Sequence, residues 1–326
     1  MDSKKRIATN RWTLPVVLLF STALWAVRLF AHPSGWPAFL FFVLSVSLMV
    51  EINNRNALMR QYSRMVSCSY IALMMMCGDL LCDHRAMAVQ CAVIMSLLLI
   101  FTTYQQRGRT GRKYWAYLFI GLAATLWPPM LLFLPVYWIA EAAYLMSFTV
   151  RSFFASLFGI VTPFWIVLPL LFVPEAREVA QRCYTSFIPA EETLSLLAAP
   201  ATIVLRPLPS DNTQTSLTAF LILLFAVSAV HYFKQSYADK IHVRMLYQFF
   251  TLLALFSLLL LLAVAAVPLF GAVTWHIPLA VFIAAAAPLV GHFVTFSSNR
   301  FSTFVFWLSS AVAVVAAVVQ TVLFVI

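Results

Sequence analysis

The stretch GLAATLWPPMLLFLP, residues 121–135, determines on which side of the membrane each later connection of the chain lies. It lies inside an apolar region, 114–147, which as one helix would be about 51 Å long, against about 30 Å for the hydrocarbon core of a bilayer. Pro128 and Pro129 have no backbone N–H, and a proline pushes the residue before it, Trp127, out of the helical conformation. The stretch therefore predicts two short helices that form a hairpin with its tip near Pro128.

The composition is that of an integral membrane protein. Hydrophobic residues make up 63% of the chain and charged residues 10%, whereas a soluble domain has about 25% charged residues. A spanning helix needs roughly 20 apolar residues, so together with the hairpin the apolar runs predict an all-α polytopic protein of about 11 transmembrane helices. The chain is expected to form a single transmembrane domain, 1–326. The other nine spans are expected near 13–31, 36–52, 65–80, 86–104, 151–173, 216–233, 247–270, 277–297 and 302–326.

The basic residues give an independent test of the hairpin, because loops rich in Lys and Arg stay in the cytoplasm. With a cytoplasmic amino terminus and the hairpin, 16 of the 21 Lys and Arg residues lie inside, against 14 if 114–147 is one span. The net charge of +10 is thereby explained as a topology signal, so we expect no nucleic-acid partner. Membrane lipids and other membrane proteins are the expected partners.

One connection, 174–215, is long enough to form an extracytoplasmic loop. Val179, Cys183 and Phe187 recur in it at helical spacing. This pattern predicts a helix that lies along the membrane surface.

Arg28, Glu141 and His292 are ionisable residues that fall inside the predicted membrane helices. An ionisable group at the centre of a membrane helix costs roughly 2.5–3.5 kcal/mol, so each is a candidate for function. Arg28 is near the outer end of its span, where its side chain is expected to reach the headgroups. Glu141 lies in the second arm of the hairpin and is expected to pair with a neighbouring helix, and His292 is deeper, where a packed, hydrogen-bonded ring is the simplest interpretation.

The segment CGDLLCDHRAM, residues 77–87, is the densest polar cluster predicted on the outer side. Asp79, Asp83 and His84 are candidates for acid–base catalysis or for holding a divalent ion. The competing interpretation, which the spacing favours, is a solvated turn in which Asp83 caps the next helix. No nucleotide-binding, zinc-protease or serine-hydrolase motif is present, and neither a cofactor nor a metal is expected.

On the inner side, the segment YQQRGRTGRKYW, residues 104–115, contains four basic residues between aromatic ones. Each basic residue near an anionic membrane surface gains about 1 kcal/mol. Contact with anionic lipid is therefore expected, with a phosphorylated ligand as the alternative. The residues concerned are Arg107, Arg109, Arg112 and Lys113.

Two resemblances accompany these patterns. The segment YLFIGLAATLWPPMLLFLPVYWIAEA, 117–142, resembles part of the membrane core of GT-C glycosyltransferases, in which a small-residue turn precedes a proline-broken helix pair. That resemblance implies a lipid-linked sugar donor and an acidic catalytic residue in the first outer loop. Here that loop is AHPSGW, 31–36, which has no carboxylate, so the catalytic residue does not carry over.

The order of EINNRNALMRQYSRM (51–65), the hairpin and SFTVRSFFASLFGIVTPFWI (147–166) is similar to a family of uncharacterised multi-pass inner-membrane proteins of Bacteroidota. Taken together, the sequence favours a non-catalytic membrane component that acts in assembly, as a scaffold or on lipids. The alternatives are a divergent GT-C-like transferase that acts on a lipid-linked substrate at the outer leaflet, and a transporter of small solutes. A transferase would need an outer cavity lined by Asp79, Asp83 or Glu191, and a transporter would need Glu141 or His292 in a central, hydrated cavity.

Overall fold

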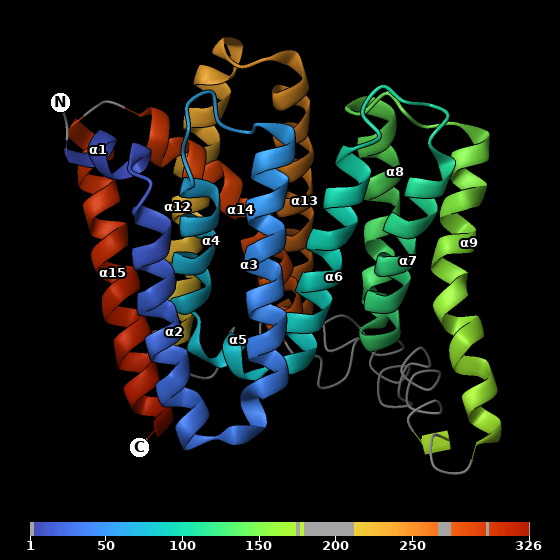
Figure 1. Ribbon diagram of the computed structural model, residues 1–326, viewed down its shortest axis with the longest axis horizontal. Coiled ribbons are helices and arrows are strands. Elements are labelled where there is room, and N and C mark those ends of the chain that lie inside the picture. The colour runs from blue at the N-terminus through green and yellow to red at the C-terminus, as the bar shows by residue number, and fades with distance from the viewer. Residues whose placement is uncertain (1–2, 174–176, 179–211, 267–274, 298–299, 326) are drawn as a thin grey trace.

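The computed structural model describes residues 3–173, 177–178, 212–266, 275–297 and 300–325. Within these ranges the protein consists of helices joined by turns, and eight of the helices are long and apolar enough to cross a membrane. The predicted all-α, polytopic fold is confirmed (Figure 1). The helices are α1 (Ser3–Thr9), α2 (Thr13–Ala31), η1 (Pro33–Gly35), α3 (Trp36–Asn56), α4 (Met65–Met75), α5 (Gly78–Cys82), α6 (His84–Phe101), α7 (Thr110–Leu126), η2 (Pro128–Phe133), α8 (Leu134–Ala143), α9 (Val150–Val167), η3 (Leu168–Phe172), α12 (Asn212–Gln235), η4 (Ser236–Ala238), α13 (Ile241–Ala266), α14 (His276–Phe296) and α15 (Arg300–Val325).

The predicted hairpin is present in α7, η2 and α8. Helix α7 ends at Leu126, and Trp127 adopts an extended conformation, with φ −148° and ψ 97°. The two prolines then start the short 3-10 turn η2, which leads into α8. An ion pair between the first turn of α7 and the last turn of α8 fixes the two arms as antiparallel. The break therefore forms where the loss of two backbone donors predicts it.

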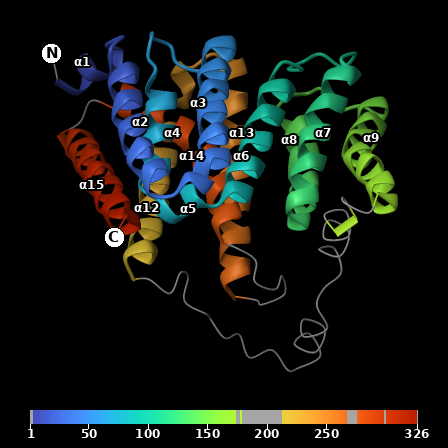
Figure 2. The same cartoon turned by 60° about the horizontal axis from the view of Figure 1, so that its bottom comes forward.

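The turns between helices alternate between two ends of the bundle (Figure 1). We call the end that carries α1 and the α3–α4, α6–α7, α8–α9 and α12–α13 connections the amino-terminal face. The opposite face carries η1, α5 and the Trp127 turn. Figure 2 shows that α15 and α2 lie at one side of the molecule and α9 at the other.

Helix α14 forms the centre of the bundle, with every residue from Ile277 to Thr295 buried. It packs against α4, α6, α12 and α13. Small residues permit the close approach: a Cβ on Gly291 would lie 3.0 Å from the backbone of Met65 in α4. Small residues at such crossings are the usual way in which membrane helices gain van der Waals contact.

Two parts of the fold differ from the expectation. The span predicted at 65–80 is broken, because α4 ends at Met75 and a separate short helix, α5, begins at Gly78. In addition, α1 is a helix that the apolar pattern did not predict. The interfacial helix expected within 174–215 falls almost entirely outside the described residues.

Candidate functional site

Arg28 supports the break between α4 and α5. Its Nη1 donates to the carbonyl of Gly78 at 2.9 Å, and its Nε donates to Oγ1 of Thr321 in α15 at 3.2 Å. Its guanidinium group lies 5.1 Å from the ring centroid of Phe324, and the residue is only 4% exposed. Gln320 completes the arrangement by accepting from the backbone N–H of Gly78.

Arg28 is therefore not extended toward the headgroups as expected. Gly78 is buried, and buried backbone groups that leave a helix must find hydrogen-bond partners in the protein. Arg28 supplies the partner of the Gly78 carbonyl, and Gln320 supplies the partner of the Gly78 N–H. The side chain that looked like an interfacial cation holds three helices together.

Asp83 caps α6, as the spacing of the sequence indicated. Its Oδ1 accepts from the backbone N–H groups of Arg85 at 2.9 Å and Ala86 at 3.2 Å, and its Oδ2 lies 3.3 Å from Nδ1 of His276. Burial opposes ionisation of this carboxyl, but the hydrogen bonds from His276 and the backbone outweigh it and hold the pKa of Asp83 below its ordinary value. Both oxygens of Asp83 are thus already occupied.

The other two members of this cluster, Asp79 and His84, have exposed side chains. Cys77 and Cys82 flank Asp79 and are free thiols. Within the described ranges no group of three or more His, Cys, Asp or Glu side chains is arranged to hold a metal ion. The cluster has the arrangement of a capped helix start in a solvated turn.

Glu141 has the partner that was expected, and the partner is Lys113. The Nζ atom of Lys113 lies 2.8 Å from Oε2 of Glu141 and donates to the carbonyl of Ser147 at 2.6 Å. The side chains of the pair are 0% and 2% exposed. Lys113 is therefore buried inside the protein and does not share the lipid-facing surface expected for it.

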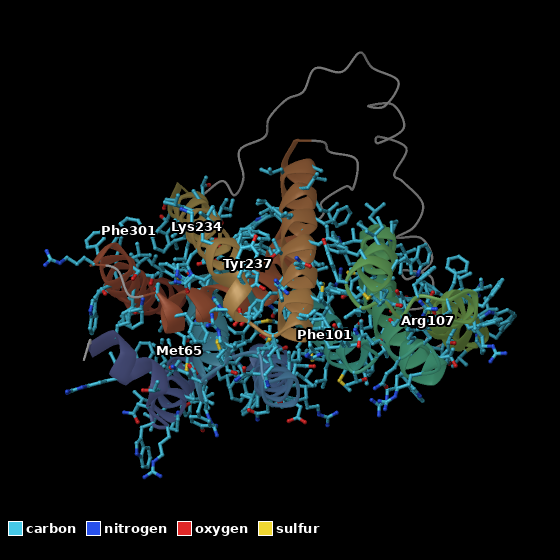
Figure 3. The ribbon with its side chains drawn as sticks, turned by 90° about the horizontal axis from the view of Figure 1, so that it is seen from above. Met65, Phe101, Arg107, Lys234, Tyr237 and Phe301 are labelled. Carbon is cyan, nitrogen blue, oxygen red and sulfur yellow. The ribbon has the colours of Figure 1, made fainter. Side chains whose placement is uncertain are left out.

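The remaining members of the basic segment behave differently. Arg107, Arg109 and Arg112 are exposed at the amino-terminal face, and Figure 3 shows Arg107 at the side of the molecule formed by α7 and α9. Adjacent residues of a helix differ by about 100° in direction. The first turn of α7 consequently points Arg112 outward and Lys113 inward.

His292 is buried at the amino-terminal face, beside the ion pair of Arg60 and Asp239. Its Nε2 lies 3.2 Å from Oδ2 of Asp239, in the turn between α12 and α13, and both side chains are 0% exposed. Arg60, from the α3–α4 connection, binds Oδ1 of the same carboxylate. The rings of Tyr232 and Tyr247 pack edge-on against the imidazole, with centroids 5.1 and 5.3 Å away.

The environment favours the charged form of Asp239. Burial opposes ionisation, but the hydrogen bond from His292 and the charge of Arg60 outweigh it and lower the pKa of Asp239. Sequence reasoning singled out His292 and missed Asp239 and Arg60. No signal linked them, because Asp239 is 53 residues from His292 and Arg60 is 179 residues from Asp239.

The amino terminus is fastened to the same end of the bundle. Lys4 in α1 is 1% exposed, and its Nζ donates to the carbonyl of Ser297, just after α14, at 3.0 Å. Ser63, in the α3–α4 connection, donates to the carbonyl of Ala8 at 2.8 Å. Polar contacts of buried side chains thus hold α1 over the end of α14.

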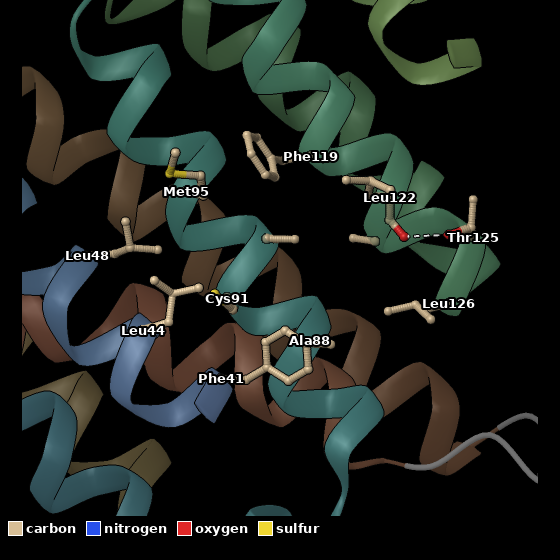
Figure 4. A pocket seen from close by; sticks show the side chains of 12 residues that line it. Phe41, Leu44, Leu48, Ala88, Cys91, Met95, Phe119, Leu122, Thr125 and Leu126 are labelled. Atoms are coloured by element: carbon tan, nitrogen blue, oxygen red, sulfur yellow. Dashed lines mark hydrogen bonds between the residues drawn. The ribbon is translucent and has the colours of Figure 1, made fainter. Parts of the chain in front are cut away.

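An apolar groove lies on the side of the bundle between α3, α6 and α7, with a volume of about 450 Å³ (Figure 4). Thr125 is the one lining residue with a polar side chain, and its hydroxyl donates to the carbonyl of Leu122 at 2.7 Å, within its own helix. Apart from this hydroxyl and the thiol of Cys91, the lining side chains have only carbon and thioether groups. The lining residues are Phe41, Leu44, Leu48, Ala88, Cys91, Ala92, Met95, Phe119, Leu122, Ala123, Thr125 and Leu126.

The eight long apolar helices, with α4, α7 and α8 between them, define the chain as a multi-pass membrane protein. No protein-family model, curated protein or solved structure matches the chain.

Proposed function

We propose that this protein is a non-catalytic, lipid-interacting component of a bacterial inner membrane, and that the groove between α3, α6 and α7 binds one acyl chain of a membrane lipid. The observation that carries the proposal is the groove itself. A volume of about 450 Å³ is within the range of roughly 300–1,000 Å³ typical of ligand pockets. Its lining, apolar except for Cys91 and Thr125, suits a hydrocarbon chain better than a polar solute.

The position of the groove supports a lipid as the occupant. Its lining residues in α3, 41–48, lie about 7 to 18 Å along the helix from its start, at depths where the bilayer is hydrocarbon. Leu44, Leu122 and Leu126 at its margin are 48%, 41% and 46% exposed in the isolated protein, as membrane-facing leucines are. A groove that opens toward the hydrocarbon core of the bilayer is filled by the acyl chains of the surrounding lipids.

The orientation belongs to the same proposal. The amino-terminal face carries the exposed Arg107, Arg109 and Arg112, and an excess of Lys and Arg marks the cytoplasmic side. We therefore place the amino terminus in the cytoplasm. The same three residues are positioned for contact with anionic headgroups, each worth about 1 kcal/mol.

The rival functions draw less support from the geometry. A transferase needs free outer carboxylates in a cavity, but both oxygens of Asp83 are engaged and Asp79 is exposed. Glu191 lies outside the described residues. A transporter needs Glu141 or His292 beside an open path. Glu141 is 1% exposed and ion-paired with Lys113, and His292 is 0% exposed and lies against Asp239.

Photocrosslinking tests the proposal. The protein is reconstituted with a phosphatidylethanolamine that carries a diazirine on its acyl chain, and crosslinked peptides are mapped by mass spectrometry. We expect crosslinks to concentrate on the groove residues of α3, α6 and α7. Ala92→Trp fills the groove and should lower this labelling several-fold.

Ala155→Trp is the matched control, because Ala155 is also a half-buried alanine in a membrane helix, α9, but lies outside the groove. This variant should label like the parent protein. Crosslinks spread evenly around the bundle, or unchanged labelling in Ala92→Trp, would overturn the proposal.

A further inference from the structure

The apolar groove lies in the half of the bundle next to the opposite face. Leu126, one of its lining residues, is the last residue of α7, and Ala88 is about one turn after the start of α6. The lining residues fall in stretches of equal length in the three helices, 41–48, 88–95 and 119–126. Such a stretch of helix is about 10 Å long, against roughly 30 Å for the whole hydrocarbon core. The groove is therefore within reach of a lipid from the leaflet on that side.

The groove-lining stripe of α6 continues to His84 and Arg85. In α6 the groove is lined by Ala88, Cys91, Ala92 and Met95 (Figure 4). His84 precedes Ala88 by four residues, and Arg85 precedes it by three. Residues at these spacings lie on the same face of a helix. The two side chains thus stand about one turn, roughly 5 Å, beyond the end of the groove, at the opposite face.

Both side chains are exposed and have donors to offer. Among the described residues, none forms a hydrogen bond or an ion pair with the imidazole of His84 or the guanidinium of Arg85. The neighbouring carboxylate, Asp83, is engaged elsewhere, because it accepts from the backbone N–H groups of Arg85 and Ala86 and lies 3.3 Å from His276. Side chains of a helix lean toward its amino-terminal end, which in α6 is the end at the opposite face. The donors are therefore available at the membrane surface, directly above the groove.

These donors suit the phosphate of a lipid headgroup. A guanidinium group presents N–H donors in a fork that matches two phosphate oxygens, and an imidazole N–H adds a third donor. The level of the headgroups is marked by Trp36, the first residue of α3, which is 53% exposed at the same end of the bundle. Tryptophan is enriched at that level of a membrane. A phospholipid with one chain in the groove therefore has its phosphate at the depth of His84 and Arg85.

We propose that the ligand of the groove is a glycerophospholipid of the leaflet at the opposite face, and that Arg85 and His84 bind its phosphate. This inference rests on the proposed function, because it takes the acyl chain in the groove as given and adds the class of lipid. Diacylglycerol has the same chains but lacks the phosphate that the two side chains bind. His84 then contributes to ligand binding and not to acid–base catalysis.

Photocrosslinking with two probes tests the proposal. Phosphatidylethanolamine and diacylglycerol that carry the same diazirine acyl chain are each added to the purified protein in detergent, below saturation, and labelled groove peptides are quantified by mass spectrometry. We expect phosphatidylethanolamine to label the groove of the parent protein several-fold more than diacylglycerol does. Arg85→Gln should remove most of this difference by lowering the labelling with phosphatidylethanolamine alone. His84→Gln should act in the same direction with a smaller effect, because it removes a single donor.

Arg112→Gln is the matched control, because Arg112 is also an exposed arginine near the start of a groove-lining helix, α7, but lies at the amino-terminal face. It should leave the labelling with both probes unchanged. If Arg85→Gln keeps the preference for phosphatidylethanolamine, or lowers the labelling with both probes equally, Arg85 does not bind the phosphate and this inference is overturned. Labelling of the groove in the parent protein would still support the proposed function in that case. No labelling of the groove by either probe would overturn the proposed function itself, and this inference with it.

Discussion

Asp239 joins three separate parts of the chain, because its two oxygens bind Arg60 and His292. Asp239→Asn removes the charge and keeps the shape, and we expect it to lower the free energy of unfolding at pH 7 by about 1.5–3 kcal/mol, the range for hydrogen bonds to charged groups. The folded state lowers the pKa of Asp239 from its ordinary 3.8. Its contribution is therefore complete above that value and is lost as the pH falls through the lowered pKa.

Thermal unfolding in detergent, followed by circular dichroism from pH 7 to pH 3, measures this difference. The gap between the parent and Asp239→Asn should stay constant down to about pH 5 and shrink below 3.8. Glu51→Gln is the control, because its pair with Arg55 is exposed and contributes less than about 1 kcal/mol. A gap that does not change with pH would mean that the charge of Asp239 is not what stabilises the cluster.

The buried residues could be found from the sequence, but their partners could not. Glu141 and His292 stand out because a charged or titratable group in an apolar run is costly. The partner of Glu141 is 28 residues earlier in the chain, inside a basic segment whose other members are exposed. Periodicity separates Lys113 from Arg112 only once the start of α7 is known, and a single sequence contains no signal that pairs residues across turns.

At the scale of helices, α9 depends on two glycines for its contact with α7. A Cβ on Gly121 would lie 2.6 Å from the carbonyl oxygen of Ile160, and one on Gly159 would lie 2.5 Å from the carbonyl oxygen of Tyr114. Backbone atoms cannot move aside as a flexible side chain can. We expect Gly121→Ala to separate the two helices at a cost of about 1–3 kcal/mol, as overpacked cores show.

Gly111→Ala is the control in the same helix, since nothing lies within 4 Å of its added Cβ. It should be neutral or stabilise α7 by up to about 1 kcal/mol through helix propensity. Unfolding measurements and limited proteolysis of the α8–α9 connection compare the two variants. Equal stability and equal protection of that connection in both would disprove the close α7–α9 packing.

Two helix breaks show why one could be predicted and the other could not. The break at Trp127 follows from local chemistry, because two successive prolines remove donors whatever surrounds them. The break before Gly78 depends on Arg28 and Gln320, which come from helices far away in the sequence and satisfy its backbone. A local sequence pattern contains the first kind of information and not the second, so the pattern at 65–80 predicts a single helix.

For the whole molecule, the hairpin determines which face every later connection occupies. Before the hairpin, the α6–α7 connection lies on the amino-terminal face and η1 lies on the opposite face. Because α7 and α8 are antiparallel, the α12–α13 connection, which follows them, also lies on the amino-terminal face. Single cysteines at Gly108, Tyr237 and Ser34 report on these three places. Gly108 and Ser34 are exposed, and Tyr237 is 84% exposed, so each accepts a reagent without repacking.

We expect a membrane-impermeant maleimide to label Ser34→Cys in intact spheroplasts, and Gly108→Cys and Tyr237→Cys only after the membrane is permeabilised. The background carries Cys82→Ser and Cys183→Ser, because Cys82 is exposed on the opposite face and would react by itself. Gly108 precedes the hairpin and Tyr237 follows it. Equal protection of the two positions therefore supports a hairpin whose two helices each cross the membrane. If 114–147 crossed the membrane once, every later connection would change sides, and Tyr237→Cys would be labelled from outside while Gly108→Cys stayed protected.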